Sequence, residues 1–527
     1  MFSCTFTKPT FDKEKTDLQK NTMKALRQLF WIIAISLLSV AVSATGLPKN
    51  PEKLREMSAL EMALAIRFGL VRSEDLVDAL IAQIKAHPEL NAFITLNEEG
   101  ARARAKELDA ALPLHARGPL HDVPIVLKDD IDVAGLPTTA GTPALKNHVP
   151  QSTAPIAQAL IDAGAIILGK NNMHELAAGI TNINFWNFCG ASTGICAVGN
   201  PYNSNMFSGG SSGGTAAAIA ARMAPAGLGE DTAGSIRIPS SLSGTVGLRP
   251  TAGRYPQDGM VLLSKTRDTA GPIARTVEDL VLLDGIITHK SVVLLPVKLR
   301  GLRLGVPRTY FYDNLDPGTA TQVEKALSKL RQAGVELVEA DIPSVEALNT
   351  AVSFPVVLFK VTRELPQYLA TTNPSVTLSE LISQIASPDV QYLIGISSTI
   401  TESLYLDAIN IYRPALQQAY QQYFAANRVD AIIFPTTPLP ARPIALSSIQ
   451  TVELNGQQVP TLNTYIRNTD PGSNAGIPGL SLPIGLTNDS LPVGIELDGP
   501  AQSDRNLLRI GLALQRLFGK LPKPDFQ

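Results

Sequence analysis

The sequence is poor in cysteine, histidine and tryptophan, and it has no excess of either charge. Its 527 residues include 3 Cys, 6 His and 2 Trp, and 45 Lys and Arg stand against 47 Asp and Glu. Because no Cys or His cluster has the spacing of metal ligands, we expect no metal site. A formal net charge of −2 without a basic run predicts no nucleic-acid partner. The length and a hydrophobic content of 45% predict a large globular core.

The sequence has one notable N-terminal apolar run, from residue 29 to residue 42. Lys24 and Arg27 precede this run and small residues end it, which is typical of a secretory signal peptide over residues 1–44. The run is too short to span a bilayer comfortably, so we expect export to the periplasm or medium and no stable membrane span after cleavage. The alternative is a membrane anchor formed by an uncleaved leader. Residues before Met23 fit a signal peptide poorly, so Met23 is an alternative start.

The three cysteines give a second expectation about the compartment. Cys4 would be lost with the leader, which leaves Cys189 and Cys196, seven positions apart in a glycine-containing segment. In an exported protein such a pair is a candidate disulfide. Two small buried thiols are an equally good interpretation.

Glycine and serine crowd the stretch Ser208–Pro250, around which the chain is organised. A loop of residues 208–214 feeds an alanine-rich helical run over residues 215–223, and a second turn of small residues follows over residues 231–235. Such a loop lets the backbone approach a ligand and points free N–H groups at negative charge. Upstream, Lys128 ends a nearly continuous apolar run that predicts a strand buried on both faces.

The loop also has sequence features of the nucleophile elbow and of the P-loop, but residues that these two motifs require are absent. Residues 209–213 spell the G-x-S-x-G elbow, but that motif needs an acid and then a histidine downstream. The only later histidine, His289, lies at an ordinary helix-to-loop junction. No lysine follows Gly214, so the loop is not a P-loop.

The two turns, together with Lys128 in the segment PIVLKDD, resemble the signature of the amidase signature family of serine hydrolases. Ser235 follows Ser211 by 24 positions, which is the separation between the two serines of that family. The resemblance implies an α/β fold: a single large domain over residues 45–527, with a central mixed β-sheet flanked by helices. It also implies that a variable region, about residues 345–426, helps to line the substrate pocket.

The resemblance implies a role for each matching residue. Ser235 would be the nucleophile, Ser211 a bridging serine after a cis peptide bond with Gly210, and Lys128 a neutral amine that accepts the proton. Burial against apolar residues would lower the pKa of that amine. The oxyanion hole would comprise the backbone N–H groups of Thr232, Ala233, Gly234 and Ser235. Asp231 and Arg237 would be supporting structural clamps.

Three residues depart from the family pattern. Ala233 stands where glycine is most common, Glu230 where threonine is frequent, and Asp130 where asparagine is common. Two carboxylates beside the amine would raise its pKa, so we expect at least one of Asp129 and Asp130 to point away. We interpret His174 as structural, since the chemistry of the family uses no histidine.

These residues predict an enzyme that hydrolyses carboxylic amides through an acyl-serine intermediate, with a small-molecule amide and water as reactants and no cofactor. The pattern of the signature is similar to that of bacterial members that act on arylalkyl amides such as mandelamide or indoleacetamide. Alternatives within the family are peptide-amide and fatty-acyl amide hydrolases. A non-catalytic binding protein that retains the fold is the alternative from another class.

Overall fold

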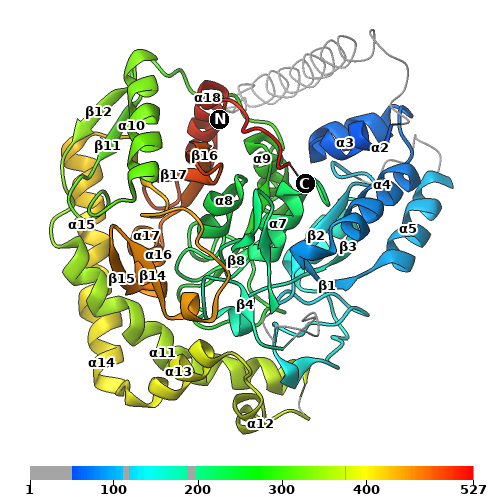
Figure 1. The fold of residues 1–527 in the computed structure, drawn as a ribbon, viewed down its shortest axis with the longest axis horizontal. Helices are drawn as coiled ribbons and strands as arrows, with labels where there is room; N and C mark the ends of the chain where they lie inside the picture. The colour runs from blue at the N-terminus through cyan, green and yellow to red at the C-terminus, as the bar shows by residue number, and fades with distance from the viewer. Residues whose placement is uncertain (1–49, 111–117, 187–195, 374, 526–527) are drawn as a thin grey trace, which may run out of the picture. The chain divides into compact units, whose positions relative to one another are not determined.

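The computed structural model describes residues 50–110, 118–186, 196–373 and 375–525 (Figure 1). The chain divides into a unit that ends at Lys53 and a unit from Leu54 to Gln527, and the second unit contains the predicted catalytic residues. The leader expected over residues 1–44 and the residue Cys189 lie outside the described residues. Export and the disulfide therefore stay predictions.

A mixed β-sheet of eleven strands forms the centre of the second unit, as far as the chain is described. Its strands are β1 (Phe93–Leu96), β2 (Pro124–Lys128), β3 (Ile166–Asn171), β8 (Ala226–Asp231), β9 (Val246–Arg249), β10 (Thr269–Ala274), β11 (Arg303–Val306), β12 (Glu336–Glu339), β13 (Ala431–Pro435), β16 (Gly479–Leu486) and β17 (Pro492–Asp498). Their order is β1-β3-β2-β8-β10-β9-β16-β17-β13-β11-β12. The pairs β2/β3, β2/β8, β11/β12 and β11/β13 are parallel, and the remaining neighbours are antiparallel.

Helices cover both faces of this sheet, which confirms the predicted fold class. From Ala59 onwards, the described α-helices are α3 (Ala59–Arg67), α4 (Ser73–Ala86), α5 (Glu98–Ala110), α6 (Pro155–Asp162), α7 (Gly213–Ala220), α8 (Arg237–Ser243), α9 (Val277–Ile287), α10 (Pro317–Gln332), α11 (Val345–Thr372), α12 (Leu378–Ser383), α13 (Pro388–Ile396), α14 (Glu402–Asp407), α15 (Arg413–Asn427), α16 (Thr461–Ile466), α17 (Asp470–Ala475) and α18 (Asp504–Phe518). The described residues also form three two-stranded sheets: β4 (Ile183–Asn184) with β5 (Cys196–Ala197), β6 (Gly199–Asn200) with β7 (Asn203–Phe207), and β14 (Thr451–Leu454) with β15 (Gln457–Pro460).

Strand β2 shows why the sheet is buried on both sides. Successive side chains of a strand point to opposite faces. Ile125 and Leu127 join the core that includes residues of α3, α6, α9 and α18, whereas Val126 joins the core formed with α4, α5 and α7. Every residue of β2 is buried, as the apolar run predicts.

Ser73, which two acidic residues follow, has the sequence pattern of a helix N-cap. In the structure it is instead the first residue of α4, and the preceding residue provides no side-chain cap. The free N–H groups of Ser73 and Glu74 instead donate to the carboxylate of Asp109, at 2.9 and 3.0 Å. A tertiary contact with α5 thus supplies the cap that the local sequence only suggests.

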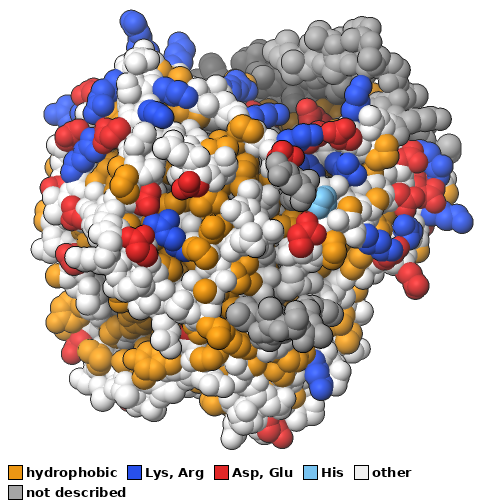
Figure 2. Space-filling model, viewed as in Figure 1, with side chains coloured by type: hydrophobic (Ala, Val, Ile, Leu, Met, Phe, Trp, Pro, Cys, Tyr) orange, Lys and Arg blue, Asp and Glu red, His pale blue; other side chains and the backbone are white. Residues whose placement is uncertain are grey.

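The helices from α11 to α14 come from the region expected to line the pocket. Among the described helices, α11 alone has the length and hydropathy of a membrane span, and 44% of its apolar window is buried inside the protein. Figure 2 shows charged side chains gathered over the upper part of the view, with more apolar surface over the lower part, where α11 and α13 lie. Tyr392 of α13 and Leu404 of α14 are among the exposed apolar side chains.

Candidate active site

Parallel pairing of β2 and β8 brings the lysine segment and the second turn to one edge of the sheet. Val126 pairs with Gly227 and Leu127 with Leu228, so the carboxyl ends of both strands point the same way. Lys128 is the last residue of β2, and Asp231 is the last residue of β8. The lysine segment and the second turn, which are far apart in the chain, are therefore adjacent in the structure.

Lys128 lies at the centre of a fully buried polar cluster. Its Nζ atom is 2.8 Å from Ser211 Oγ, 2.9 Å from Glu230 Oε2 and 3.0 Å from Asp130 Oδ2. All four side chains have no exposed surface. The peptide bond between Gly210 and Ser211 is cis, as the resemblance implies. The structure therefore brings together the predicted base and the predicted bridging serine.

The predicted direction of the pKa shift of Lys128 is wrong. Burial does lower the pKa of the amine, but the carboxylates of Asp130 and Glu230 raise it by more in combination, so the net shift is upward. Burial raises the pKa of Glu230 to about 8 against the lowering effect of Lys128. Because one ammonium and two carboxylates lie together in a buried site, the protonation state of each group depends on that of the others.

Only one of the two aspartates after Lys128 turns away from it. Asp129 accepts a hydrogen bond from Thr139 N at 2.9 Å and lies 3.3 Å from the Nζ atom of Lys170. Asp130 does not turn away, because it contacts Lys128. Asp129 therefore meets the expectation that at least one of the two aspartates points away from Lys128. Asp130 is one of the two carboxylates that raise the pKa of Lys128.

Ser235 lies beside the cluster, shortly before the start of α8. The N–H of Ser212 donates to the carbonyl oxygen of Ser235 at 3.1 Å, which ties the two turns together. Ser235 is 5% exposed and lines a pocket. The hydrogen bonds of the described residues include none between Ser211 Oγ and Ser235 Oγ, so that link of the proton relay stays a prediction.

The predicted oxyanion hole has three candidate donors rather than four. The N–H of Gly234 already donates to Asp231 Oδ1 at 2.8 Å, so this amide is engaged within the protein. The remaining candidates are the amides of Thr232, Ala233 and Ser235. Gly234 carries the positive φ of the turn, at 138°, and Ala233 is outside that region, so alanine fits its position without strain.

Asp231 is the support of this turn. Its carboxylate accepts Nε and Nη2 of Arg237, both at 3.0 Å, and Nη1 of Arg249 at 3.0 Å. Burial raises the pKa of Asp231, but the two guanidinium groups lower it by more, so it stays well below its ordinary value. Asp231 and Arg237 are fully buried, so neither is a solvated charge of a surface loop.

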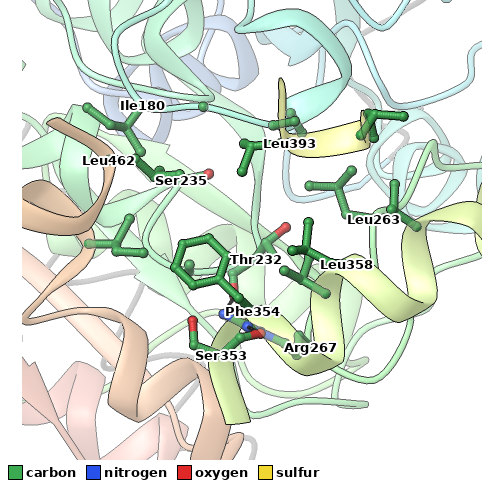
Figure 3. A pocket seen from close by; sticks show the side chains of 18 residues that line it. Ile180, Thr232, Ser235, Leu263, Arg267, Ser353, Phe354, Leu358, Leu393 and Leu462 are labelled. Atoms are coloured by element: carbon green, nitrogen blue, oxygen red, sulfur yellow. Dashed lines mark hydrogen bonds between the residues drawn. The ribbon is translucent and has the colours of Figure 1, made fainter. Parts of the chain in front are cut away.

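A largely apolar pocket opens beside Ser235, with an empty volume of about 620 Å³, part of it open to solvent (Figure 3). Helices α11 and α13, from the region expected to line it, contribute much of its wall. Its apolar lining includes Ile180, Leu263, Phe354, Leu358, Val361, Leu393, Ile394, Leu462 and Ile466. The charged residue of the described lining, Arg267, pairs with Asp470 and donates to the carbonyl oxygen of Ser353 at 2.8 Å.

His174 lies close to the pocket residues but takes no part in the cluster. Its Nδ1 accepts the N–H of Asn182 at 3.2 Å, and its Nε2 lies 3.0 Å from Asp389 Oδ2. Beside it, Glu175 accepts the N–H of Ser387 at 2.7 Å, just before α13. Both residues attach α13 to the rest of the domain, which agrees with the structural interpretation of His174.

Sequence reasoning missed the partners of the predicted catalytic residues. Glu230 is the clearest case, since the sequence marks it only as a departure from the family pattern. Asp268 is a second buried carboxylate near Glu230, and Arg267 lines the pocket. The described residues include no group of three or more His, Cys, Asp and Glu that could hold a metal ion.

Comparison with known proteins identifies related sequences over most of the chain. The family model "Amidase" matches residues 75–508. An indoleacetamide hydrolase of Agrobacterium vitis is 46% identical over 454 residues, which cover 86% of this chain and 95% of the relative. A mandelamide hydrolase of Pseudomonas putida is 39% identical over 504 residues, 92% of this chain and 96% of the relative.

A solved structure with the same fold is that of a peptide amidase from Stenotrophomonas maltophilia. It matches with a TM-score of 0.77 at 29% identity, over 89% of this chain and 99% of that chain. The similarity thus extends over nearly the whole second unit.

Proposed function

Because this chain belongs to the amidase family and is an amide-hydrolysing enzyme, we propose that it cleaves primary amides with an aryl group in the acyl part, using Lys128, Ser211 and Ser235. Indoleacetamide is the first candidate substrate and mandelamide the second, in line with the relatives. Peptide-amide and fatty-acyl amide substrates are the alternatives within the family.

The proposed acylation moves one proton through two hydroxyl groups. Neutral Lys128 accepts the proton of Ser211, Ser211 accepts that of Ser235, and Ser235 Oγ forms a bond to the amide carbon. Backbone N–H groups of the second turn stabilise the oxyanion. The C–N bond then breaks, and Lys128 returns the proton through Ser211 to the departing nitrogen. Water releases the acid from acyl-Ser235 by the reverse sequence of proton transfers.

The observation that carries the substrate class is the apolar pocket at Ser235. The apolar side chains that surround it favour an uncharged acyl group, whose burial contributes about 25 cal/mol per Å². The guanidinium of Arg267 is neutralised by Asp470, so it is not free to bind a substrate carboxylate. An aryl group fits such a lining better than the side chain of glutamine or asparagine.

The test is ammonia release from a panel of primary amides. The panel contains indole-3-acetamide, mandelamide, acetamide, glutamine, a long-chain fatty amide and a peptide amide. We expect the highest kcat/KM for an aryl amide, with the value for acetamide much lower because acetamide buries little apolar surface. A highest value for glutamine, the peptide amide or the fatty amide would replace the proposed substrate class.

The Ser235→Ala variant is the control for the chemistry. We expect it to release no ammonia above background and to lose labelling by a fluorophosphonate serine probe, while its thermal unfolding is retained. Equal labelling of the wild type and the variant would contradict the role of Ser235.

A further inference from the structure

Lys128 has an unusual environment for a residue proposed to act as a base. A base needs a neutral amine with its lone pair towards the proton that it takes, but two buried carboxylates lie within 3.0 Å of Nζ. Carboxylates so close favour the ammonium form. The site therefore needs a way to free the amine of one proton.

The two carboxylates do not contact Lys128 in the same way. The Nζ atom donates to Glu230 Oε2 at 2.9 Å and to the backbone oxygen of Glu230 at 3.4 Å. Asp130 lies 3.0 Å away, but neither of its oxygens has a partner with hydrogen-bond geometry. A neutral amine that presents its lone pair to Ser211 keeps two N–H groups, and Glu230 offers an acceptor for each. Asp130 raises the pKa of Lys128 chiefly through its charge.

We propose that Glu230 is a positioning residue that accepts one proton from the ammonium of Lys128, so that the neutral amine forms inside the buried site. This inference rests on the proposed role of Lys128 as the base. In the transfer, an N–H bond of the ammonium breaks and an O–H bond forms on Glu230 Oε2. The net charge of the pair does not change, and no proton has to leave for solvent.

The surroundings of Glu230 suit this role. Its second oxygen, Oε1, accepts the hydroxyl of Thr232 at 3.1 Å, which fixes the carboxyl group while Oε2 faces the amine. Burial raises the pKa of Glu230 to about 8, with Asp268 and Asp130 adding to the increase and Lys128 opposing it. Arg267 acts in turn on Asp268. A carboxylate of this basicity accepts a proton from an ammonium far more readily than an ordinary glutamate.

The pH dependence follows from the proton count. Above its pKa, Glu230 is ionised and can take the ammonium proton; below it, Glu230 is already protonated and cannot. Because that pKa is raised to about 8, we expect kcat of the wild type to rise as the pH increases through about 8. In Glu230→Gln, which keeps the size of the side chain, this titration is absent while Asp130 still lies 3.0 Å from the ammonium, so the rise near pH 8 should disappear. Just above that pH, kcat should fall by roughly 100-fold with KM nearly unchanged.

Two further variants separate this role from a structural one. Asp268→Asn removes a charge that raises the pKa of Glu230, so the rise in kcat should move to lower pH. Glu230→Asp keeps a carboxylate and should restore part of the pH-dependent rise. Asp279→Asn is the matched control, because Asp279 is a buried carboxylate that accepts the N–H of Leu60 and lies in the first turn of α9. Its pH profile should equal that of the wild type.

The measurement is ammonia release from indole-3-acetamide across neutral and alkaline pH, on full-length proteins with verified cooperative unfolding. A wild-type profile in Glu230→Gln would overturn the inference. Should that variant not fold, an unmoved rise in Asp268→Asn would overturn it equally. If the wild type releases no ammonia, or if Ser235→Ala is fully active, the proposed function on which the inference rests would be refuted instead.

Discussion

The Nζ atom of Lys128 lies 2.8 Å from Ser211 Oγ, although the two residues are 83 positions apart in the chain. This contact depends on β2 ending where the glycine-rich loop begins α7, because Lys128 is the last residue of β2 and Ser211 lies just before the first turn of α7. The contact gives the proposed relay its first link.

The Lys128→Ala variant should therefore lose kcat by roughly 100-fold to 10,000-fold, since no group remains to accept the proton of Ser211. Ammonia release at neutral and mildly alkaline pH measures the loss, and circular dichroism checks the fold. Lys128→Arg is the control for charge, because a guanidinium stays protonated and should be equally inactive. Full activity of Lys128→Ala at neutral pH would refute its role.

The residues that carry the proposed chemistry were predictable because they occur in local motifs. The apolar run that ends at Lys128 predicts a buried strand, and the resemblance to the amidase signature, with 24 positions between its two serines, implies the roles of Lys128, Ser211 and Ser235. The contact of Lys128 with Glu230 was not predictable, since it depends on the register of β8 beside β2. The direction of the lysine pKa shift was missed for the same reason.

Tertiary contacts also decided details that the local sequence only suggested. Asp109, on a different helix, replaces the expected cap at Ser73, and Asp231 engages the amide of Gly234 that was expected in the oxyanion hole. In both cases a carboxylate satisfies a backbone N–H for which the sequence suggested another partner. Residue type alone cannot indicate which amide such a carboxylate will choose.

Replacement of Asp231 by asparagine should destabilise the protein, because it leaves Arg237 and Arg249 buried without their shared counter-charge. Loss of one partner of a buried pair costs about 3–5 kcal/mol. The pKa of Asp231 lies well below its ordinary value, so its stabilisation is present above about pH 4 and lost as the pH falls below that. The difference in unfolding free energy between wild type and variant should therefore shrink as urea titrations are carried to lower pH. A constant difference would contradict this assignment.

Gly234→Ala should distort the second turn and lower kcat by roughly 100-fold, comparable to the loss of one oxyanion donor. A Cβ atom at this position would meet Thr469 Oγ1, and the φ of 138° is unfavourable for alanine. Gly253→Ala is the control, since Gly253 also has a positive φ, of 79°, but its added Cβ would meet no atom within 4 Å. That variant should lose about 1 kcal/mol of stability and keep its kcat.

The predicted leader has a direct test of its own. Expression of the full chain, followed by sequencing of the mature N-terminus, should give a protein that begins at Thr45. A mature chain that still begins before Lys24 would contradict export by cleavage.

Mass spectrometry of the same sample, with and without reduction, tests the predicted bond between Cys189 and Cys196, because a disulfide lowers the mass by that of the two thiol hydrogens.

The ring of Phe354 lies among the apolar side chains of the pocket beside Ser235 (Figure 3). Phe354→Ala should lower kcat/KM for indole-3-acetamide by about ten-fold, which corresponds to about 1.4 kcal/mol of lost apolar and aromatic contact. The value for acetamide, which is too small to fill the pocket, should change little. Leu446→Ala provides the control, because Leu446 is 56% exposed and does not line the pocket. Equal losses for both substrates would indicate damage to the catalytic turn and not to recognition of the aryl group.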